Sequence, residues 1–323
     1  MRIPPKFAAA SRFNEGAAVV AMEGRRGLID DHGAWLIEPF LVDATELHSG
    51  RLAVVVRGRG WVYVDRAGHV THAPTDRQRW AHAGPFLDGR ARVVVDAPIG
   101  IQRPVGYLDL DGGWAIAPAL TDGDDFADGL AAAKDGLGRW GFIDRRGAWV
   151  IAPRWAAARS FSDGLAPVAD DDGAIRYLDP RGREVCRSPV AVPSIASADL
   201  PRFAEDRCPV PGPGGAIGYM DRHGAIAIPP HPRHVGGFAG GRARIHDADG
   251  RTGYIDATGA VVIPPRFGIA EDFLGGVARV VVDPRRPGKV GWIDRDGGWV
   301  WHPERTRRRR GRTTGRNAPG ART

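Results

Sequence analysis

Eight aspartates, each with a glycine three residues later, are the residues of this sequence whose type and spacing could do chemistry: Asp30, Asp65, Asp109, Asp144, Asp179, Asp221, Asp256 and Asp294. Converging carboxylates can act as general acid and base or bind a metal ion. A catalytic carboxylate, however, does not require eight copies. Asp at the first position of a tight turn accepts a hydrogen bond from the amide two residues on, and Gly at the fourth position can take a positive φ. We therefore predict that these aspartates are turn residues with no catalytic role.

The rest of the sequence contains no recognised catalytic or cofactor motif. The acidic groups at 122–125 and 170–172 lack the spacing and the closing Glu of a calcium loop. Nucleophile-elbow, phosphate-loop and dinucleotide-binding patterns are missing. Cys186 and Cys208 are too few for a four-cysteine zinc site and are expected to be free thiols in a reducing compartment. The sequence predicts a protein that is not an enzyme and has no metal or cofactor.

The eight aspartates belong to an internal repeat, and the distance from one to the next is 35 to 44 residues. Before each aspartate lies Phe-x-x-Gly or a close variant, followed by small and β-branched residues, as in "FSDGLAPV" from Phe161. In most copies an apolar stretch ending in Pro follows, as in "AWVIAP" from Ala148. The second copy has Leu47 in place of Phe, and the sixth has Asp206 in place of Gly. We predict one repeat array over residues 1–303 and a separate tail over 304–323.

This combination of Phe-x-x-Gly-Leu-Ala-x-Val, Trp-Gly-x-Ile-Asp-x-x-Gly and Val-Ile-x-Pro resembles the WG-repeat family of bacterial β-repeat proteins. The resemblance covers about residues 8–303. The pair that names the family is intact at Trp140 and Gly141, whereas other copies carry a different residue before the glycine, such as Arg26 or Val105. The resemblance implies a repeat architecture and no shared chemistry.

Each copy is predicted to form three short strands. Residues after Phe-x-x-Gly alternate with period two, as in Ala91, Val93 and Val95. The second strand runs up to the aspartate, and the third ends at the Pro, which has no amide to donate. A three-stranded unit cannot bury both faces alone, so neighbours must stack on one another. We expect an all-β protein of eight tandem units of ~35 residues in an open solenoid-like array, with a closed β-propeller-like ring as the alternative.

Inserted residues fall in the hairpins between the first and second predicted strands, at 96–105, 209–217 and 283–290. We expect them to lie on one side of the assembly, which is then the candidate binding face. Four tryptophans occupy a third-strand position where other copies carry Val or Ile, which favours packing over an aromatic ladder for sugars or bases: Trp35, Trp114, Trp149 and Trp299. Three more fall outside this register and are candidates for exposed contacts: Trp80, Trp155 and Trp301.

The formal charge of +7 comes entirely from residues 304–323. Removing the eight arginines and the single Glu304 of this tail from the chain totals of 45 basic and 38 acidic residues leaves 37 of each in residues 1–303. The tail has few apolar residues to pack and is predicted to be disordered. Its candidate electrostatic contacts are Arg305, Arg307, Arg308, Arg309, Arg310 and Arg312.

The leading functional hypothesis is a non-enzymatic scaffold that binds a protein partner through the surface between units and through the hairpin inserts. The alternatives are association with nucleic acid or an anionic surface through the tail, and binding of envelope glycans. The first residues lack the apolar core of a signal peptide, and no run approaches the ~20 apolar residues of a spanning helix. We therefore expect a cytoplasmic protein with no membrane span.

Overall fold

The computed structural model describes residues 7, 9–75, 78–191, 196–283 and 290–301. The chain divides into two compact units, residues 1–238 and residues 239–323. The helices of the described part are two short 3-10 turns, η1 (Ser197–Asp199) and η2 (Pro213–Gly215). In this part of the chain, no helix has the length and apolar character needed to cross a membrane. The predicted all-β class is confirmed.

The strands form eight antiparallel sheets and follow the chain order within each sheet. Sheet 1 contains β1 (Ala9–Ala10), β2 (Ala17–Met22), β3 (Arg25–Asp30) and β4 (Trp35–Leu41). Sheet 2 contains β5 (Asp43–Ala44), β6 (Arg51–Val56), β7 (Gly60–Asp65) and β8 (Val70–His72). Sheet 3 contains β9 (Trp80–Leu87), β10 (Arg90–Val95), β11 (Val105–Leu108) and β12 (Trp114–Leu120). Sheet 4 contains β13 (Asp122–Gly123), β14 (Leu130–Lys134), β15 (Trp140–Asp144) and β16 (Trp149–Trp155).

The remaining sheets repeat the same order. Sheet 5 contains β17 (Ala157–Ala158), β18 (Ala166–Ala169), β19 (Ile175–Leu178) and β20 (Glu184–Arg187). Sheet 6 contains β21 (Cys208–Pro211), β22 (Ile217–Met220) and β23 (Ile226–His231). Sheet 7 contains β24 (His234–Ala239), β25 (Arg242–His246), β26 (Thr252–Ile255) and β27 (Val261–Phe267). Sheet 8 contains β28 (Ile269–Ala270), β29 (Val277–Val281), β30 (Val290–Asp294) and β31 (Trp299–Trp301).

The predicted three-stranded unit is wrong for seven of the eight sheets, which have four strands. The additional strand precedes Phe-x-x-Gly and is often only two residues long. In sheet 5, Ala157 and Ala158 of β17 pair with Ala169 and Val168 of β18. Two residues display no periodicity, so the sequence pattern alone could not reveal this strand.

Sheet 6 has three strands, and Pro201 explains the difference. Pro201 lies two residues before the Phe of its Phe-x-x-Gly variant. At the matching position of sheet 5, the amide of Arg159 donates to the carbonyl of Pro167 at 3.1 Å. Proline has no amide to make this bond, and the residues just before it form the 3-10 turn η1 instead.

The Phe-x-x-Gly segments are two-residue turns between the first and second strands. Both turn residues have positive φ in every copy, for example 50° at Asp88 and 73° at Gly89. This is the type I′ geometry, whose twist matches that of the flanking strands. Glycine suits the second position because it has no Cβ, and the sixth copy places Asp206 there at φ 59°.

The glycine of the Trp-Gly pair lies under a bulge of the outer strand. Trp140 pairs with Trp155, but Phe142 pairs with Ile151, so the outer strand has two extra residues here. A Cβ on Gly141 would lie 2.5 Å from the carbonyl oxygen of Ile151. The Pro that was predicted to end the third strand lies inside this bulge, within β16, where a residue without an amide is tolerated at a sheet edge.

An aromatic pair joins each of several sheets to the next. Tyr107 of β11 packs against Phe126 with ring centroids 4.9 Å apart, and its Oη donates to the carbonyl of Asp124 at 2.8 Å. The same donation, to the residue two positions before the next Phe, is made by all five tyrosines of the chain: Tyr63, Tyr107, Tyr177, Tyr219 and Tyr254.

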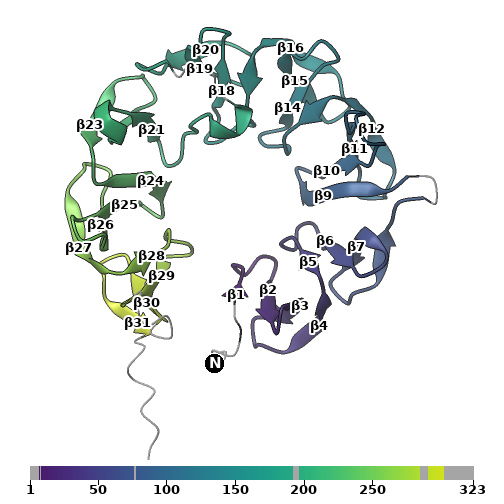
Figure 1. Cartoon of the computed structure of the whole chain (residues 1–323), viewed down its shortest axis with the longest axis horizontal. Coiled ribbons are helices and arrows are strands. Elements are labelled where there is room, and N and C mark those ends of the chain that lie inside the picture. The colour runs from purple at the N-terminus through teal and green to yellow at the C-terminus, as the bar shows by residue number, and fades with distance from the viewer. Residues whose placement is uncertain (1–6, 8, 76–77, 192–195, 284–289, 302–323) are drawn as a thin grey trace, which may run out of the picture. The chain divides into compact units, whose positions relative to one another are not determined.

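The predicted open solenoid-like array is wrong, and the alternative architecture is the one found: the sheets are blades of a β-propeller. In residues 1–238, the earlier strands of the sheets lie on the inner side of a curve and the last strands on its outer side (Figure 1). The side chains explain this curvature. Small residues such as Ala131 to Ala133 fill the space between second strands, whereas large ones such as Trp155 fill it near the outer strands. Neighbouring sheets therefore approach more closely at their inner than at their outer strands.

Candidate functional site

The repeated aspartates have the predicted turn role in all eight copies. Oδ1 of Asp144 accepts the amides of Arg146 and Ala148, each at 2.9 Å, and Gly147 has φ 85°. These two amides, that of Ala148 foremost, hold the pKa of Asp144 below its usual value. The seven counterparts make the same pair of hydrogen bonds. A carboxylate engaged in this way serves the backbone, not a substrate.

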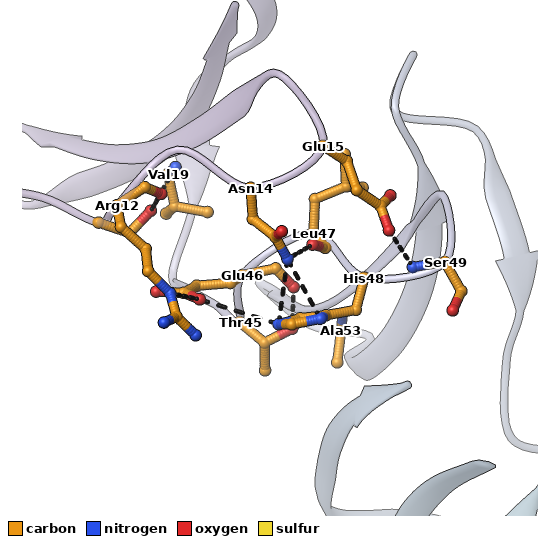
Figure 2. A network of polar contacts seen from close by, with 11 residues as sticks. Arg12, Asn14, Glu15, Val19, Thr45, Glu46, Leu47, His48, Ser49 and Ala53 are labelled. Atoms are coloured by element: carbon orange, nitrogen blue, oxygen red, sulfur yellow. Dashed lines mark hydrogen bonds and ion pairs between the residues drawn. The ribbon is translucent and has the colours of Figure 1, made fainter. Parts of the chain in front are cut away.

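The type I′ turns of neighbouring sheets are also linked to one another, as Figure 2 shows for sheets 1 and 2. The carboxylate of Glu15 accepts the amides of Ser49 and Gly50 at 2.7 and 2.8 Å. Asn14 donates from Nδ2 to the carbonyl of Leu47 at 2.6 Å. Each partner lies in the turn that follows by one repeat, so the network fixes one sheet against the next.

A hollow of about 540 Å³ lies at the corresponding junction of sheets 3 and 4, and its lining is Asp88, Asp128, Gly129, Asp144, Arg145 and Arg146. The amide of Gly129 donates to Asp88 at 2.7 Å, and Arg145 lies 3.6 Å from the same carboxylate. Asp128 accepts the amide of Gly164 at 3.2 Å. Because Asp88 links sheet 3 to sheet 4 and Asp128 links sheet 4 to sheet 5, we interpret this hollow as part of the scaffold.

The described residues contain one group of side chains with the spacing of metal ligands: Asp30, Asp31 and His32, whose ligand atoms lie within 4.8 Å of one another. Oδ1 of Asp30 is already occupied by the turn amides of His32 and Ala34. Asp31 and His32 are exposed and pair with each other at 2.7 Å. This group has the composition of an ordinary repeat turn, and nothing buried around it completes a coordination shell.

The tryptophans differ from expectation in part. Trp35 and Trp114 are half-buried, as predicted for packing, but Trp149 and Trp299 of the outer strands are exposed. Trp80 and Trp155, which were candidates for exposed contacts, are buried, and Trp301 is half-buried. Trp155 lies in the core between sheets 4 and 5 because its position faces the neighbouring sheet.

The three most exposed large hydrophobic side chains of the described residues lie on hairpins between the second and third strands. Ile99 and Ile101 lie in the loop of sheet 3, and Leu137 lies at the hairpin tip of sheet 4. Their exposed fractions are 106%, 63% and 89%. We call these three side chains, with the loops that carry them, the hairpin surface.

Polar contacts hold the hairpin surface in shape. Gln102 donates from Nε2 to the carbonyl of Thr121 at 2.7 Å, and the hydroxyl of Thr121 donates to the carbonyl of Asp135 at 2.7 Å. Asp135 in turn accepts the amide of Leu137 at 2.9 Å. This relay connects the loop of sheet 3, which carries the exposed isoleucines, to the hairpin of sheet 4, which carries the exposed leucine.

Two of the three predicted inserts fall within the described residues. The insert at 96–105 carries the exposed isoleucines, and the insert at 209–217 contains the turn η2. Most of the third, at 283–290, lies outside the described residues, and so do the tail arginines Arg305, Arg307, Arg308, Arg309, Arg310 and Arg312. The electrostatic role of these arginines stays a prediction, as does the boundary at residue 303.

Comparison with known families gives a match to the WG containing repeat at four regions: residues 1–25, 106–136, 140–172 and 253–283. These four regions are WG repeats. The predicted resemblance is therefore confirmed. No curated relative matches the sequence significantly.

Solved structures with similar folds exist at low identity. A eukaryotic initiation factor matches at 12% identity with a TM-score of 0.56, covering 89% of this chain and 84% of the other. The computationally designed Ika8 protein matches at 14% identity and a TM-score of 0.51, covering 92% and 96%. BamB from Moraxella catarrhalis matches at 12% identity and a TM-score of 0.50, covering 85% and 96%. At these identities, the likeness concerns the fold of the WG repeats alone.

The sequence correctly predicted that the insert at 96–105 lies on a hairpin, but its pattern did not single out Ile99, Ile101 or Leu137. A signal was available. Each of these residues has a Gly as its immediate neighbour in the chain, within a turn or loop segment. Turns of this kind are formed by Gly and polar residues and do not require an apolar side chain. An aliphatic residue at such a position has no local structural reason, unlike the repeated aspartates.

Proposed function

We propose that this WG-repeat protein is a non-enzymatic scaffold and that it binds a protein partner through the hairpin surface. The observation that carries the proposal is the exposure of Ile99, Ile101 and Leu137 at the tips of neighbouring hairpins. A clustered apolar surface rimmed by polar groups is typical of a binding site. The charged rim consists of the pairs Asp96–Arg103 at 3.1 Å and Arg139–Asp171 at 2.8 Å.

The rest of the molecule supports a scaffold role. The repeated carboxylates are engaged by backbone amides, and the hollow at sheets 3 and 4 is bridged by the Asp88–Arg145 pair. These groups stabilise turns and hold sheets together. Sheets that are held together in this way and present hairpin loops at one end suit recognition of a partner more than chemistry on a substrate.

The test replaces the three aliphatic residues together, as I99S/I101S/L137S, in the full chain. Burying one such side chain at an interface contributes about 1.5 kcal/mol or more, so the triple variant should lose at least ~100-fold in affinity. Proteins captured from a cell extract by wild type and variant are compared by quantitative mass spectrometry, and the affinity of each differential partner is then measured with purified components.

The matched control is Val150→Ser, which alters an exposed aliphatic residue of the outer strand β16. Partners lost with the triple variant but retained by V150S would support the proposal. An identical set of captured proteins with all three chains would overturn it.

A further inference from the structure

Three arginines for which the described residues supply no charge partner lie at the end of the sheets that carries the hairpin surface. Arg57 and Arg59 occupy the hairpin between β6 and β7, and Arg79 directly precedes β9. All three are exposed. Among the described residues, none of them has an ion pair or a side-chain hydrogen bond, whereas Arg103 and Arg139 of the next two hairpins are paired with acids.

The fold brings these arginines to the same end of the sheets as Ile99 and Ile101. The carbonyl of Arg79 accepts the amide of Asp96 at 2.8 Å, at the base of the loop that carries the isoleucines. Trp61, two residues after Arg59, contacts His82 with ring centroids 5.2 Å apart, which joins sheets 2 and 3 at this end.

The described acidic groups on the hairpins of sheets 2, 3 and 4 are already engaged. In the hairpins of sheets 2, 3 and 4 the acids are Asp96 and Asp135. Asp96 pairs with Arg103, and Asp135 accepts the amides of Leu137 and Arg139. Among the described residues of these hairpins, Arg57, Arg59 and Arg79 are therefore left without an acidic partner beside exposed aliphatic side chains, and the hairpin of sheet 1 adds one acid, Glu23.

We propose that the hairpin surface recognises an acidic protein segment that also carries apolar side chains. The inference rests on the proposed function and names the class of its partner. Apolar residues of the segment pack on Ile99, Ile101 and Leu137, and its carboxylates pair with Arg57, Arg59 and Arg79. Guanidinium groups bind carboxylates in a bidentate manner, and opposite charge accelerates association.

A nucleic acid would satisfy the arginines but not the aliphatic side chains. Phosphates and riboses offer no surface that buries isoleucine, and bases are bound mainly by aromatic stacking. The hairpin surface carries two isoleucines and a leucine at its tips, and these favour a polypeptide.

The experiment selects random short peptides displayed against the full chain and sequences those that bind. Enriched peptides are expected to combine Asp or Glu with Leu, Ile, Val or Phe. The affinity of one enriched peptide is then measured by fluorescence anisotropy for wild type, for R57E/R59E and for I99S/I101S/L137S. The matched charge control is R146E/R181E, which reverses two exposed arginines in Asp-x-x-Gly turns at the other end of the sheets.

We expect R57E/R59E to weaken binding at least ~10-fold and to flatten its salt dependence, because two charge-assisted contacts are lost. R146E/R181E should bind as wild type. Enriched peptides without acidic residues, or equal binding by R57E/R59E and wild type, would overturn the inference and leave the proposed function standing.

Two further outcomes are informative. If no selected peptide depends on Ile99, Ile101 or Leu137, both the inference and the proposed function fail. A labelled DNA duplex is titrated in parallel. Binding that is lost in R57E/R59E but kept in I99S/I101S/L137S would assign the arginines to nucleic acid and overturn the inference.

Discussion

The hydroxyl of Tyr107 in sheet 3 donates a hydrogen bond to the carbonyl oxygen of Asp124 in sheet 4, at 2.8 Å. The ring that carries the hydroxyl packs against Phe126, two residues after Asp124. One side chain thus fills the space between two sheets and satisfies a backbone acceptor of the neighbour. Because each WG repeat can bury its faces only against adjacent repeats, such contacts between sheets determine stability.

Tyr107→Phe should therefore destabilise the protein although the ring stays in place. The carbonyl of Asp124 loses a donor in a largely buried setting, which costs about 1 to 2 kcal/mol. Chemical unfolding followed by tryptophan fluorescence measures the change. Phe13→Leu at an exposed position is the control and should shift the free energy of unfolding by less than ~0.5 kcal/mol. An unchanged midpoint for Tyr107→Phe would show that water replaces the hydroxyl.

The Asp-x-x-Gly turns could be predicted from sequence because their reason is local. Oδ1 of Asp144 binds amides two and four residues ahead, so the residue types alone specify the turn. The partners of the tyrosines are 17 to 24 residues away. Their role depends on how one sheet lies on the next, which no local pattern encodes.

The curvature of the array could not be predicted for the same reason. Ala131 and Trp155 have ordinary positions in a period-two pattern, and their effect appears only when neighbouring sheets pack together. The exposure of Ile99 was equally hidden. Isoleucine is usually a buried residue, so its type alone does not predict exposure, and only the packing of the folded chain shows that nothing covers it.

Gly141→Ala tests why the family glycine recurs. Its Cβ would lie 2.5 Å from the carbonyl oxygen of Ile151 and 2.7 Å from the nitrogen of Pro153, both backbone atoms of the bulge. Relief requires movement of the outer strand, so we expect a loss of about 1 to 3 kcal/mol.

The matched control is Gly136→Ala, where no atom lies within 4 Å of the added Cβ. This variant should unfold at nearly the wild-type midpoint, measured in the same denaturant titration. Equal stability of both variants would mean that the bulge yields easily and that the glycine has another role.

Asp144→Ala should remove both side-chain hydrogen bonds of one repeated turn, at a cost of about 1 kcal/mol. Asp144→Asn keeps an acceptor oxygen and should lose less. The pKa of Asp144 is lowered in the folded state. The stabilisation that its carboxylate gives the folded state is therefore present above the unfolded pKa near 3.8, and it is lost as the pH falls through the folded-state pKa.

Denaturant midpoints at neutral pH and at about pH 3 separate these effects. The difference between wild type and Asp144→Ala should shrink at the lower pH. A difference that is independent of pH would indicate that the carboxylate charge has no part in holding the turn.

The two cysteines should be unreactive until the protein unfolds. Burial raises the pKa of Cys186 to about 11 and that of Cys208 to about 12, and both thiols are buried. Since the thiolate is the reactive form, a thiol reagent at pH 8 should label the native chain far more slowly than the chain in denaturant.

The same shifts predict a loss of stability at alkaline pH. A thiol whose pKa is raised by folding contributes its full share of folding stability below the unfolded pKa near 9. This contribution disappears as the pH rises toward the folded pKa values. Buried tyrosines act in the same direction, because burial also raises the pKa of Tyr107 and Tyr177. Replacing both cysteines, as C186A/C208A, should therefore reduce the decline of the unfolding midpoint between about pH 9 and 11 without abolishing it. Cys186 and Cys208 belong to one buried cluster formed by residues of sheets 5 and 6. Rapid labelling of native protein at pH 8, or an alkaline decline that is the same in both proteins, would show that this cluster does not protect them.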